Sequence, residues 1–363
     1  MVSASLPVFP WDTLADVTAL ARSHTDGIVD LSVGTPVDPV APLIREALAA
    51  ASSSPGYPTT AGTPALRASA GAALHRRYGI TGLADDAVLP VIGTKELIAW
   101  LPTLLGIGPD DLVVVPELAY PTYEVGAQLA SAQVVRADSL TQLGPQSPAL
   151  VYLNSPSNPT GKVLGVEHLR KVVGWARDRG VLIASDECYL GLGWDAEPVS
   201  VLHPSVCDGD HTGLLAVHSL SKTSSLAGYR AGFVAGDPAV VAELLAVRKH
   251  AGMMVPTPVQ AAMVAALDDD AHEREQRERY ARRRALLLPA LQSAGLTVDN
   301  SEAGLYVWAT RDEPCRDTLA WLAEYGILVA PGEFYGPRGS CHVRVALTAT
   351  DERIDAAVQR LTS

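Results

Sequence analysis

The chain is poor in cysteine and in aromatic residues. Four of its 363 residues are cysteine, and phenylalanine, tryptophan and tyrosine together make up 6%. The cysteines lie far apart, without the spacing of a metal site or a redox pair, at Cys188, Cys207, Cys315 and Cys341. This argues against a disulfide framework and is typical of reduced thiols, so we expect a cytoplasmic protein.

Basic charge and long apolar runs are also scarce. Lysine and arginine number 28 against 40 aspartates and glutamates, which gives a formal net charge of -12 and a pI near 5.2. Most of the surface would repel a phosphate backbone, which argues against nucleic acid or an anionic membrane as a partner. No stretch approaches the roughly 18 apolar residues of a membrane span, and residues 1–11 contain no secretory signal. A small anionic substrate stays compatible with this charge, because a locally basic pocket can attract it.

The chain is long enough, and at 48% hydrophobic residues apolar enough, for two domains with substantial cores. Apolar strand candidates recur at 87–92, 112–115, 133–136, 149–153, 181–185, 214–218 and 230–235. Helical patterns, with apolar residues three and four apart, lie between many of them at 95–105, 122–130, 166–179 and 239–249. This alternation predicts an α/β fold, a mostly parallel sheet with helices on both faces.

The pattern changes beyond Met254. A long helical region is predicted at 259–294, and shorter strands at 304–310, 327–330 and 342–347 precede a last helix at 351–361. The stretch 272–284 carries charges of both signs, so we predict an exposed helix face laced with side-chain pairs. These elements indicate a smaller α+β domain. We predict a large domain over 33–250 and a small domain formed by 1–32, with a helix at 9–24, and 251–363.

Polar residues directly follow four of the predicted strands. In an open parallel sheet, the ligand crevice lies outside the carboxyl ends of the strands. Gly93, Thr94 and Lys95 follow the first strand, and backbone N–H groups at such a junction can receive a phosphate, although Gly-Thr turns are common without one. The other three segments are 154–161, 186–189 and 219–222. We expect all four segments at the same edge of the sheet.

Lys222 and Asp186 are the residues most suited to chemistry. A primary amine at a strand's end, beside hydroxyls and followed by Arg230, suits a lysine that forms a Schiff base with a cofactor bearing an aldehyde and a phosphate; a solvated loop lysine is the alternative. A carboxylate after an apolar strand is costly unless it meets a cation, and a pyridinium nitrogen is one. Tyr189 could then donate to the phenolate oxygen of the ring; otherwise Asp186 caps the next segment and Tyr189 lies in the core. Asn158 could donate to a ring oxygen, or it could simply be a turn-forming residue.

Together these segments resemble the fold-type I, pyridoxal-phosphate-dependent aminotransferases of class I/II over nearly the whole chain. The resemblance implies pyridoxal 5'-phosphate as cofactor, held covalently by Lys222, with Asp186 at the pyridine nitrogen and Asn158 and Tyr189 at the phenolic oxygen. It implies a phosphate site formed by Ser219, Ser221, Arg230 and the segment Gly93, Thr94 and Lys95. Tyr120 resembles the aromatic residue stacked on the cofactor ring, and a core aromatic is the alternative.

The resemblance extends to the substrate and to a partner. Arg344 matches the arginine that binds the substrate α-carboxylate, with Gly34 and Asn158 nearby, and a guanidinium fork has the right shape for bidentate capture. Without the resemblance, an arginine flanked by valines in a strand is simply an exposed face. Tyr57 resembles the tyrosine that reaches the phosphate of the neighbouring subunit, which implies a homodimer with shared active sites.

The opening segments 9–12 and 33–39 look most like those of the short bacterial succinyldiaminopimelate aminotransferases. These enzymes exchange an amino group between N-succinyl-LL-2,6-diaminopimelate and 2-oxoglutarate or glutamate, in lysine and cell-wall precursor biosynthesis. Aspartate-specific relatives place an arginine for the distal carboxylate soon after the large domain, and 250–260 contains none. A PLP-dependent C–S lyase or decarboxylase and a catalytically silent PLP-binding regulator are the alternatives.

Overall fold

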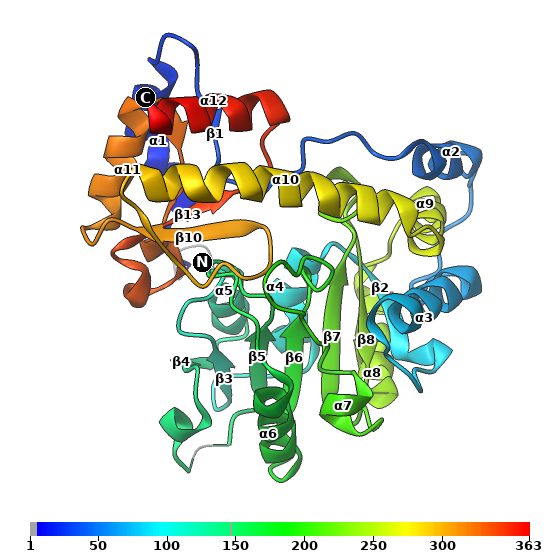
Figure 1. The fold of residues 1–363 in the computed structure, drawn as a ribbon. Helices are drawn as coiled ribbons and strands as arrows, with labels where there is room; N and C mark the ends of the chain where they lie inside the picture. The colour runs from blue at the N-terminus through cyan, green and yellow to red at the C-terminus, as the bar shows by residue number, and fades with distance from the viewer. Residues whose placement is uncertain (1–5, 146) are drawn as a thin grey trace.

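The computed structural model describes residues 6–145 and 147–363, and its largest element is a seven-stranded sheet (Figure 1). The strands lie in the order β2 (Val88–Ile92), β8 (Ala231–Gly236), β7 (Leu214–Ser219), β6 (Leu182–Asp186), β5 (Leu150–Asn154), β3 (Leu112–Val115) and β4 (Gln133–Arg136). β8 runs antiparallel to both of its neighbours, and the other neighbouring pairs are parallel. The mostly parallel sheet is confirmed, and each predicted strand is found to within one residue at either end.

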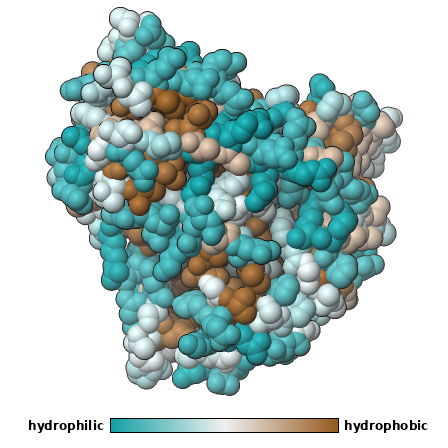
Figure 2. Space-filling view, viewed as in Figure 1, coloured by the Kyte–Doolittle hydropathy of each residue, from teal (hydrophilic) through white to brown (hydrophobic). Residues whose placement is uncertain are grey.

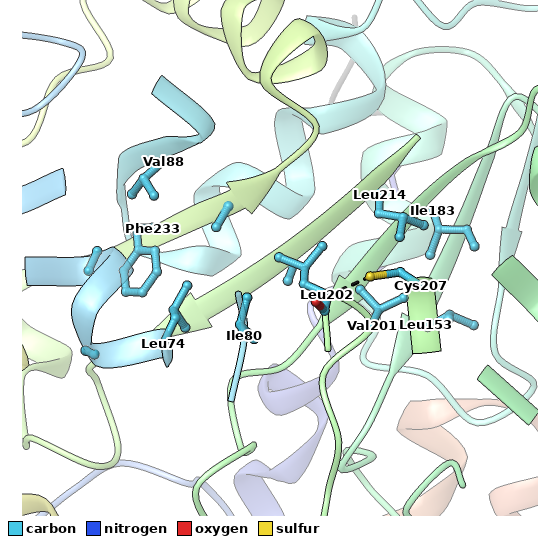
Figure 3. Close-up of a cluster of buried hydrophobic side chains, with 14 of the residues drawn as sticks. Leu74, Ile80, Val88, Leu153, Ile183, Val201, Leu202, Cys207, Leu214 and Phe233 are labelled. Atoms are coloured by element: carbon cyan, nitrogen blue, oxygen red, sulfur yellow. Dashed lines mark hydrogen bonds between the residues drawn. The ribbon is translucent and has the colours of Figure 1, made fainter. Parts of the chain in front are cut away.

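Helices cover both faces of this sheet, as predicted. One face carries α4 (Thr94–Leu104), α5 (Thr122–Leu129) and α8 (Pro238–Ala251). The other carries α3 (Pro64–Tyr78), α6 (Val166–Arg177), α7 (Pro204–Cys207), α9 (Thr257–Asp268) and, packed on α9, α2 (Pro42–Ala50). Figure 3 shows part of the second layer, where Leu74 and Ile80 pack near Phe233 and Val88 of the sheet. Because the central strands are covered on both sides, their sequences are nearly continuous apolar runs.

A smaller antiparallel sheet lies beside the large one. Its strands lie in the order β12 (Ala330–Pro331), β13 (His342–Ala346), β10 (Tyr306–Thr310) and β9 (Thr297–Asp299), and β1 (Val29–Asp30) pairs separately with β11 (Ile327–Leu328). The helices packed with it are α1 (Ala15–Arg22), α10 (Ala271–Ser293), α11 (Cys315–Glu324) and α12 (Asp351–Thr362). The region predicted as one strand at 327–330 is two short strands. The domain boundaries stay predictions, and residues 1–5 and 146 lie outside the described part.

Short 3-10 helices connect several of these elements. They are η2 (Pro10–Leu14), η3 (Asp85–Ala87), η4 (Leu140–Leu143), η5 (Ala227–Tyr229), η6 (Gly332–Tyr335) and η7 (Pro337–Gly339). The predicted helix at 9–24 is therefore η2 followed by α1, and α1 packs against α11.

The helical region predicted at 259–294 is two helices, α9 and α10, and α10 lies between α12 and the large sheet (Figure 1). The prediction of an exposed charged face at 272–284 is wrong for part of that stretch, since Tyr280 and Arg283 are buried. Arg283 donates to both carboxylate oxygens of Asp38, at 2.8 and 2.6 Å, and to Asp351 at 2.7 Å. The reason is that α10 is covered by neighbours on more than one side, so its arginine needs buried partners.

Candidate active site

A cavity of about 230 Å³ lies outside the carboxyl ends of β5, β6 and β7. Twelve of the fourteen residues predicted for the site line it, and they are Gly34, Thr94, Lys95, Tyr120, Asn158, Asp186, Tyr189, Ser219, Ser221, Lys222, Arg230 and Arg344. Gly93 lies immediately beside it, and Tyr57 lies elsewhere. The carboxyl ends of parallel strands meet at one edge, and the antiparallel direction of β8 brings Arg230, just before its first residue, to the same edge.

Lys222 follows the end of β7, and its amine points across the cavity to the backbone carbonyl of Gly34, to which it donates a hydrogen bond. Burial lowers the pKa of Lys222 to about 8, and the positive charges of Arg344 and Arg230 act in the same direction. A lysine with a lowered pKa has a larger fraction of free amine near neutral pH, which is the nucleophilic form.

Asp186 ends β6 and is buried, with 7% of its surface exposed. Burial raises the pKa of its carboxyl group, whereas hydrogen bonds from Cys188 and Tyr123 oppose that rise. The Tyr123 hydroxyl donates to one carboxylate oxygen at 2.6 Å, and the Cys188 N–H donates to the other at 3.1 Å. No cation pairs with this carboxylate among the described residues. A buried carboxylate that faces a cavity in this way is suited to a positively charged group of a ligand.

The opposite end of the cavity is suited to an anion. Gly93 has a φ of +76° and is the N-cap of α4, so the free N–H groups of the first helical turn begin there. A Cβ atom added at Gly93 would collide with the guanidinium group of Arg230. Arg230 therefore abuts the helix N-terminus, and the hydroxyl-bearing residues Ser219 and Ser221 line the same cavity. Helix N–H groups, a guanidinium and hydroxyls together form a suitable phosphate cradle.

A third set of contacts surrounds Arg344, which is 2% exposed. Its guanidinium donates to the Asn158 side-chain oxygen at 2.9 Å and to the Ser32 carbonyl at 2.7 Å, and it lies 3.9 Å from the centre of the Tyr306 ring. The Tyr306 hydroxyl in turn lies 3.1 Å from that of Tyr189. No carboxylate pairs with Arg344 among the described residues, so this buried cation is available to an anionic ligand group.

Lys95 lies at the exposed mouth of the cavity. Its amine is 5.4 Å from the ring centre of Phe9 and 5.6 Å from that of Tyr120. Trp11 also lines the cavity, and its ring packs on Phe9 with centroids 5.5 Å apart. No acidic side chain pairs with Lys95 in the described part of the chain. The mouth therefore combines apolar rings with one unpaired positive charge.

A family model described as aminotransferase class I and II matches residues 26–361. The chain belongs to this family. The aminotransferase is 82% identical over 361 residues to the probable aminotransferase Rv1178 of Mycobacterium tuberculosis, across 99% of this chain and 86% of the relative. It is 58% identical over 357 residues to the 4-dedimethylamino-4-oxo-anhydrotetracycline transaminase OxyQ of Streptomyces rimosus, across 98% and 99% of the two chains.

A solved structure of a probable N-succinyldiaminopimelate aminotransferase from Thermus thermophilus has a TM-score of 0.86 to this aminotransferase. The two are 28% identical, and the superposition covers 98% of this chain and 99% of that one. The predicted fold of a fold-type I aminotransferase is confirmed, and the family to which the chain belongs uses pyridoxal phosphate. None of the helices described for the aminotransferase is long and apolar enough to cross a bilayer.

Several cavity residues of the aminotransferase were missed by sequence reasoning. Tyr306 and Trp11 carry no local motif, and they reach the cavity only because the small sheet and the N-terminal segment pack over the large sheet. Tyr123 had a signal, since it closes the run 120–123 that already contains Tyr120. Tyr57 is 98% exposed and contributes nothing to the cavity of its own chain.

Proposed function

We propose that this aminotransferase binds pyridoxal 5'-phosphate and moves an amino group between N-succinyl-LL-2,6-diaminopimelate and 2-oxoglutarate. The observation that carries the proposal is that one cavity is lined by Lys222, by the buried Asp186, by the cradle around Arg230 and by Arg344. An amine, an unpaired buried carboxylate and an anion cradle fit the aldehyde, pyridine nitrogen and phosphate of this cofactor. The roles that follow rest on this fit.

The cofactor, when bound, supplies an electron sink for the electrons of the substrate Cα–H bond. Lys222 would hold it covalently at rest, and its freed amine would then take the proton from the substrate Cα and return a proton as general base and acid. Asp186, kept in place by Tyr123 and Cys188, would hold the proton on the pyridine nitrogen. Arg344 would orient the substrate by its α-carboxylate, which fixes the Cα–H bond near the amine.

The mouth of the cavity supports a donor whose far end is anionic. The resemblance counts Lys95 in the phosphate segment, but its unpaired amine lies beside the rings of Phe9 and Tyr120, so we assign it to the donor instead. These rings, with Trp11, can cover an aliphatic chain. A succinylated diaminopimelate has such a chain and ends in a carboxylate. The likeness to the probable N-succinyldiaminopimelate aminotransferase of Thermus thermophilus supports the same donor.

A second candidate is a transaminase that acts on a cyclic ketone. The 58% identity to OxyQ, whose name gives an oxo-anhydrotetracycline as its substrate, favours it. A multi-ring ketone carries no α-carboxylate beside the reacting carbon, so its half-reaction would not need Arg344, although the half-reaction of an amino acid donor still would. The effect of an Arg344 substitution on the half-reaction with the acceptor alone therefore separates the two candidates.

The remaining part of the proposal concerns assembly and location. Tyr57 projects from the molecule almost fully exposed, which is unusual for a tyrosine and fits a side chain that enters the site of a second copy. We therefore propose a homodimer with shared active sites, in the cytoplasm. Sedimentation of the wild type tests the homodimer, and a monomer would contradict it. The cofactor affinity of Tyr57→Ala tests whether the active sites are shared.

The deciding experiment is a panel of amino donors tested with 2-oxoglutarate, comprising N-succinyl-LL-2,6-diaminopimelate, glutamate, aspartate and aromatic amino acids. We expect the succinylated donor to have the highest kcat/KM. Lys95→Met should raise KM for that donor about fivefold with little change in kcat, because it removes a partly exposed ion pair. Lys249→Met, which changes the same charge outside the cavity, is the matched control. A preference for aspartate or an aromatic donor would discard the proposed substrate.

Removal of Lys222 tests the chemistry without regard to the donor. Lys222→Ala should lose turnover by at least about 10²- to 10⁴-fold, and it should lose the absorbance of the lysine-bound cofactor. Lys171→Ala, on the exposed side of α6, is the control. If Lys222→Ala retained both properties, the assignment of this lysine would be wrong.

A further inference from the structure

A second cavity, of about 400 Å³, lies on the α6 face of the large sheet and shares no lining residue with the active-site cavity. Its apolar wall comes from β3, β5, η4 and α6 and includes Val114, Leu140, Val151 and Val172. In Figure 2, apolar atoms appear in a hollow over the middle of the large sheet. Cavities of about 300–1,000 Å³ with apolar walls and a few polar groups are typical of small-molecule sites.

Three polar side chains at this cavity are unused by the described part of the protein. Lys162, His168 and Asn300 line it, and their side chains have no hydrogen-bond or ion-pair partner among the described residues. Burial lowers the pKa of His168, and the charges of Lys162 and Lys171 lower it further while Asp138 opposes them. Asp138 is the one acidic residue in the described lining, and it accepts a hydrogen bond from the Glu117 backbone. The cavity is therefore apolar inside, with an unpaired ammonium group at its edge.

One wall of this second cavity is in direct contact with the active site. Asn154 lines the cavity, and its side chain accepts a hydrogen bond from the Asn158 N–H at 2.7 Å and donates one to the Asp186 carbonyl at 3.0 Å. Asn158 in turn accepts from Arg344. A change on the cavity side of Asn154 therefore reaches three residues of the active site through buried hydrogen bonds. Asn300 follows β9 of the small sheet, so a ligand here would also touch both sheets.

We propose that this cavity is a second ligand site, which binds a small organic anion with an apolar body, such as an aryl or alkyl carboxylate or sulfonate. The apolar body lies against Leu140 and Val151, and the anionic group meets Lys162. Because residue Asn154 is part of the cavity wall and its side chain holds the active-site loop, occupancy changes the affinity of the active site for its substrates, and the effect is reciprocal. The site is independent of the donor and acceptor proposed above.

The test uses the PLP-saturated enzyme and the fluorescent aryl sulfonate 8-anilinonaphthalene-1-sulfonate. We expect one saturable site whose fluorescence rises on binding. Lys162→Met should weaken the affinity about fivefold, the upper end for one exposed ion pair. Leu140→Trp should abolish the signal because the larger side chain fills the cavity. Lys249→Met, which removes the same charge from α8 on the opposite face of the large sheet, should leave the affinity unchanged.

Three outcomes overturn the proposal: no saturable binding, unchanged binding in Lys162→Met, or equal weakening in Lys249→Met, which would indicate a general charge effect. Circular dichroism checks that Leu140→Trp is folded. If that variant does not fold, Lys162→Met still tests the site. The KM for 2-oxoglutarate, measured with and without saturating probe, should change in the wild type and not in Leu140→Trp. An unchanged KM in the wild type overturns the coupling through Asn154.

Discussion

Gly93 is the position where a single methyl group should damage cofactor binding most selectively. It has a φ of +76° at the N-cap of α4, and a Cβ atom there would meet the guanidinium of Arg230. Gly93→Ala therefore has two consequences. The alanine must adopt a φ of +76° with a ψ of 149°, a region essentially restricted to glycine, which costs about 1–3 kcal/mol, and Arg230 must leave its place beside the helix N-terminus.

The loss of Arg230 from the phosphate cradle determines how much the cofactor affinity falls. A hydrogen bond to a charged group contributes about 1.5–3 kcal/mol, so one lost contact to a phosphate corresponds to an affinity about 10- to 150-fold weaker. Titration of the cofactor-free protein with pyridoxal phosphate, followed by absorbance, measures this change. The backbone strain appears separately, as a lower free energy of unfolding of the cofactor-free protein.

Gly106 offers a matched control. Its φ is +73°, nearly that of Gly93, and no atom lies within 4 Å of a Cβ atom placed there. Gly106→Ala should therefore lower the unfolding free energy through its positive φ alone, with an unchanged affinity for the cofactor. If the two variants bind pyridoxal phosphate equally well, the phosphate cradle does not lie between Gly93 and Arg230.

Two further substitutions test the buried polar contacts, with urea denaturation as the measurement. Asp38→Ala leaves the buried Arg283 without its main carboxylate partner and should cost about 3 kcal/mol, whereas Asp208→Ala breaks an exposed pair and should cost at most about 1 kcal/mol. Burial raises the pKa of Asp38, but the hydrogen bonds from Arg283 and Gln276, together with the charges of Arg283 and Arg279, outweigh burial, so the net pKa is lowered. The stabilisation should thus be complete above about pH 4, the unfolded-state value, and be lost as the pH falls through the folded-state pKa. Tyr123→Phe removes the 2.6 Å hydrogen bond to Asp186 and should cost about 1.5–3 kcal/mol; an unchanged unfolding free energy would contradict the role given to this phenol.

The large sheet was predictable because its strands are buried on both faces. Apolar runs such as 112–115 and 214–218 stand out from the helical patterns between them, and their ends were found to within one residue. The direction of β8 was not predictable, since a run of apolar residues is the same in either orientation. The strands β1 and β9 are two and three residues long, too short for any periodicity. The prediction that the charged face of α10 is exposed was also wrong in part, because a charge pattern does not show which elements cover Arg283.

The residues of the candidate site also fall into a predictable and an unpredictable group. Lys222, Asp186 and Asn158 follow strand ends, and the rule that strand ends share an edge is enough to bring them together. The contact between Tyr189 and Tyr306 joins residues 117 positions apart and depends on how the two sheets pack, which no local pattern records. The roles of these residues toward the cofactor stay predictions that the variants above would test.

Helix α10 is linked to both sides of the hydrogen bond between the Lys222 amine and the Gly34 carbonyl. The Tyr280 hydroxyl on this helix donates to the Lys222 carbonyl at 3.2 Å, and Arg283, one turn further on, holds Asp38, four residues beyond Gly34. Helix α10 thus holds both the Lys222 backbone and the chain segment that contains Gly34 and Asp38. If the small sheet shifts during turnover, both anchors travel with the same helix, so the distance between the amine and the Gly34 carbonyl is maintained while the surroundings of the substrate change.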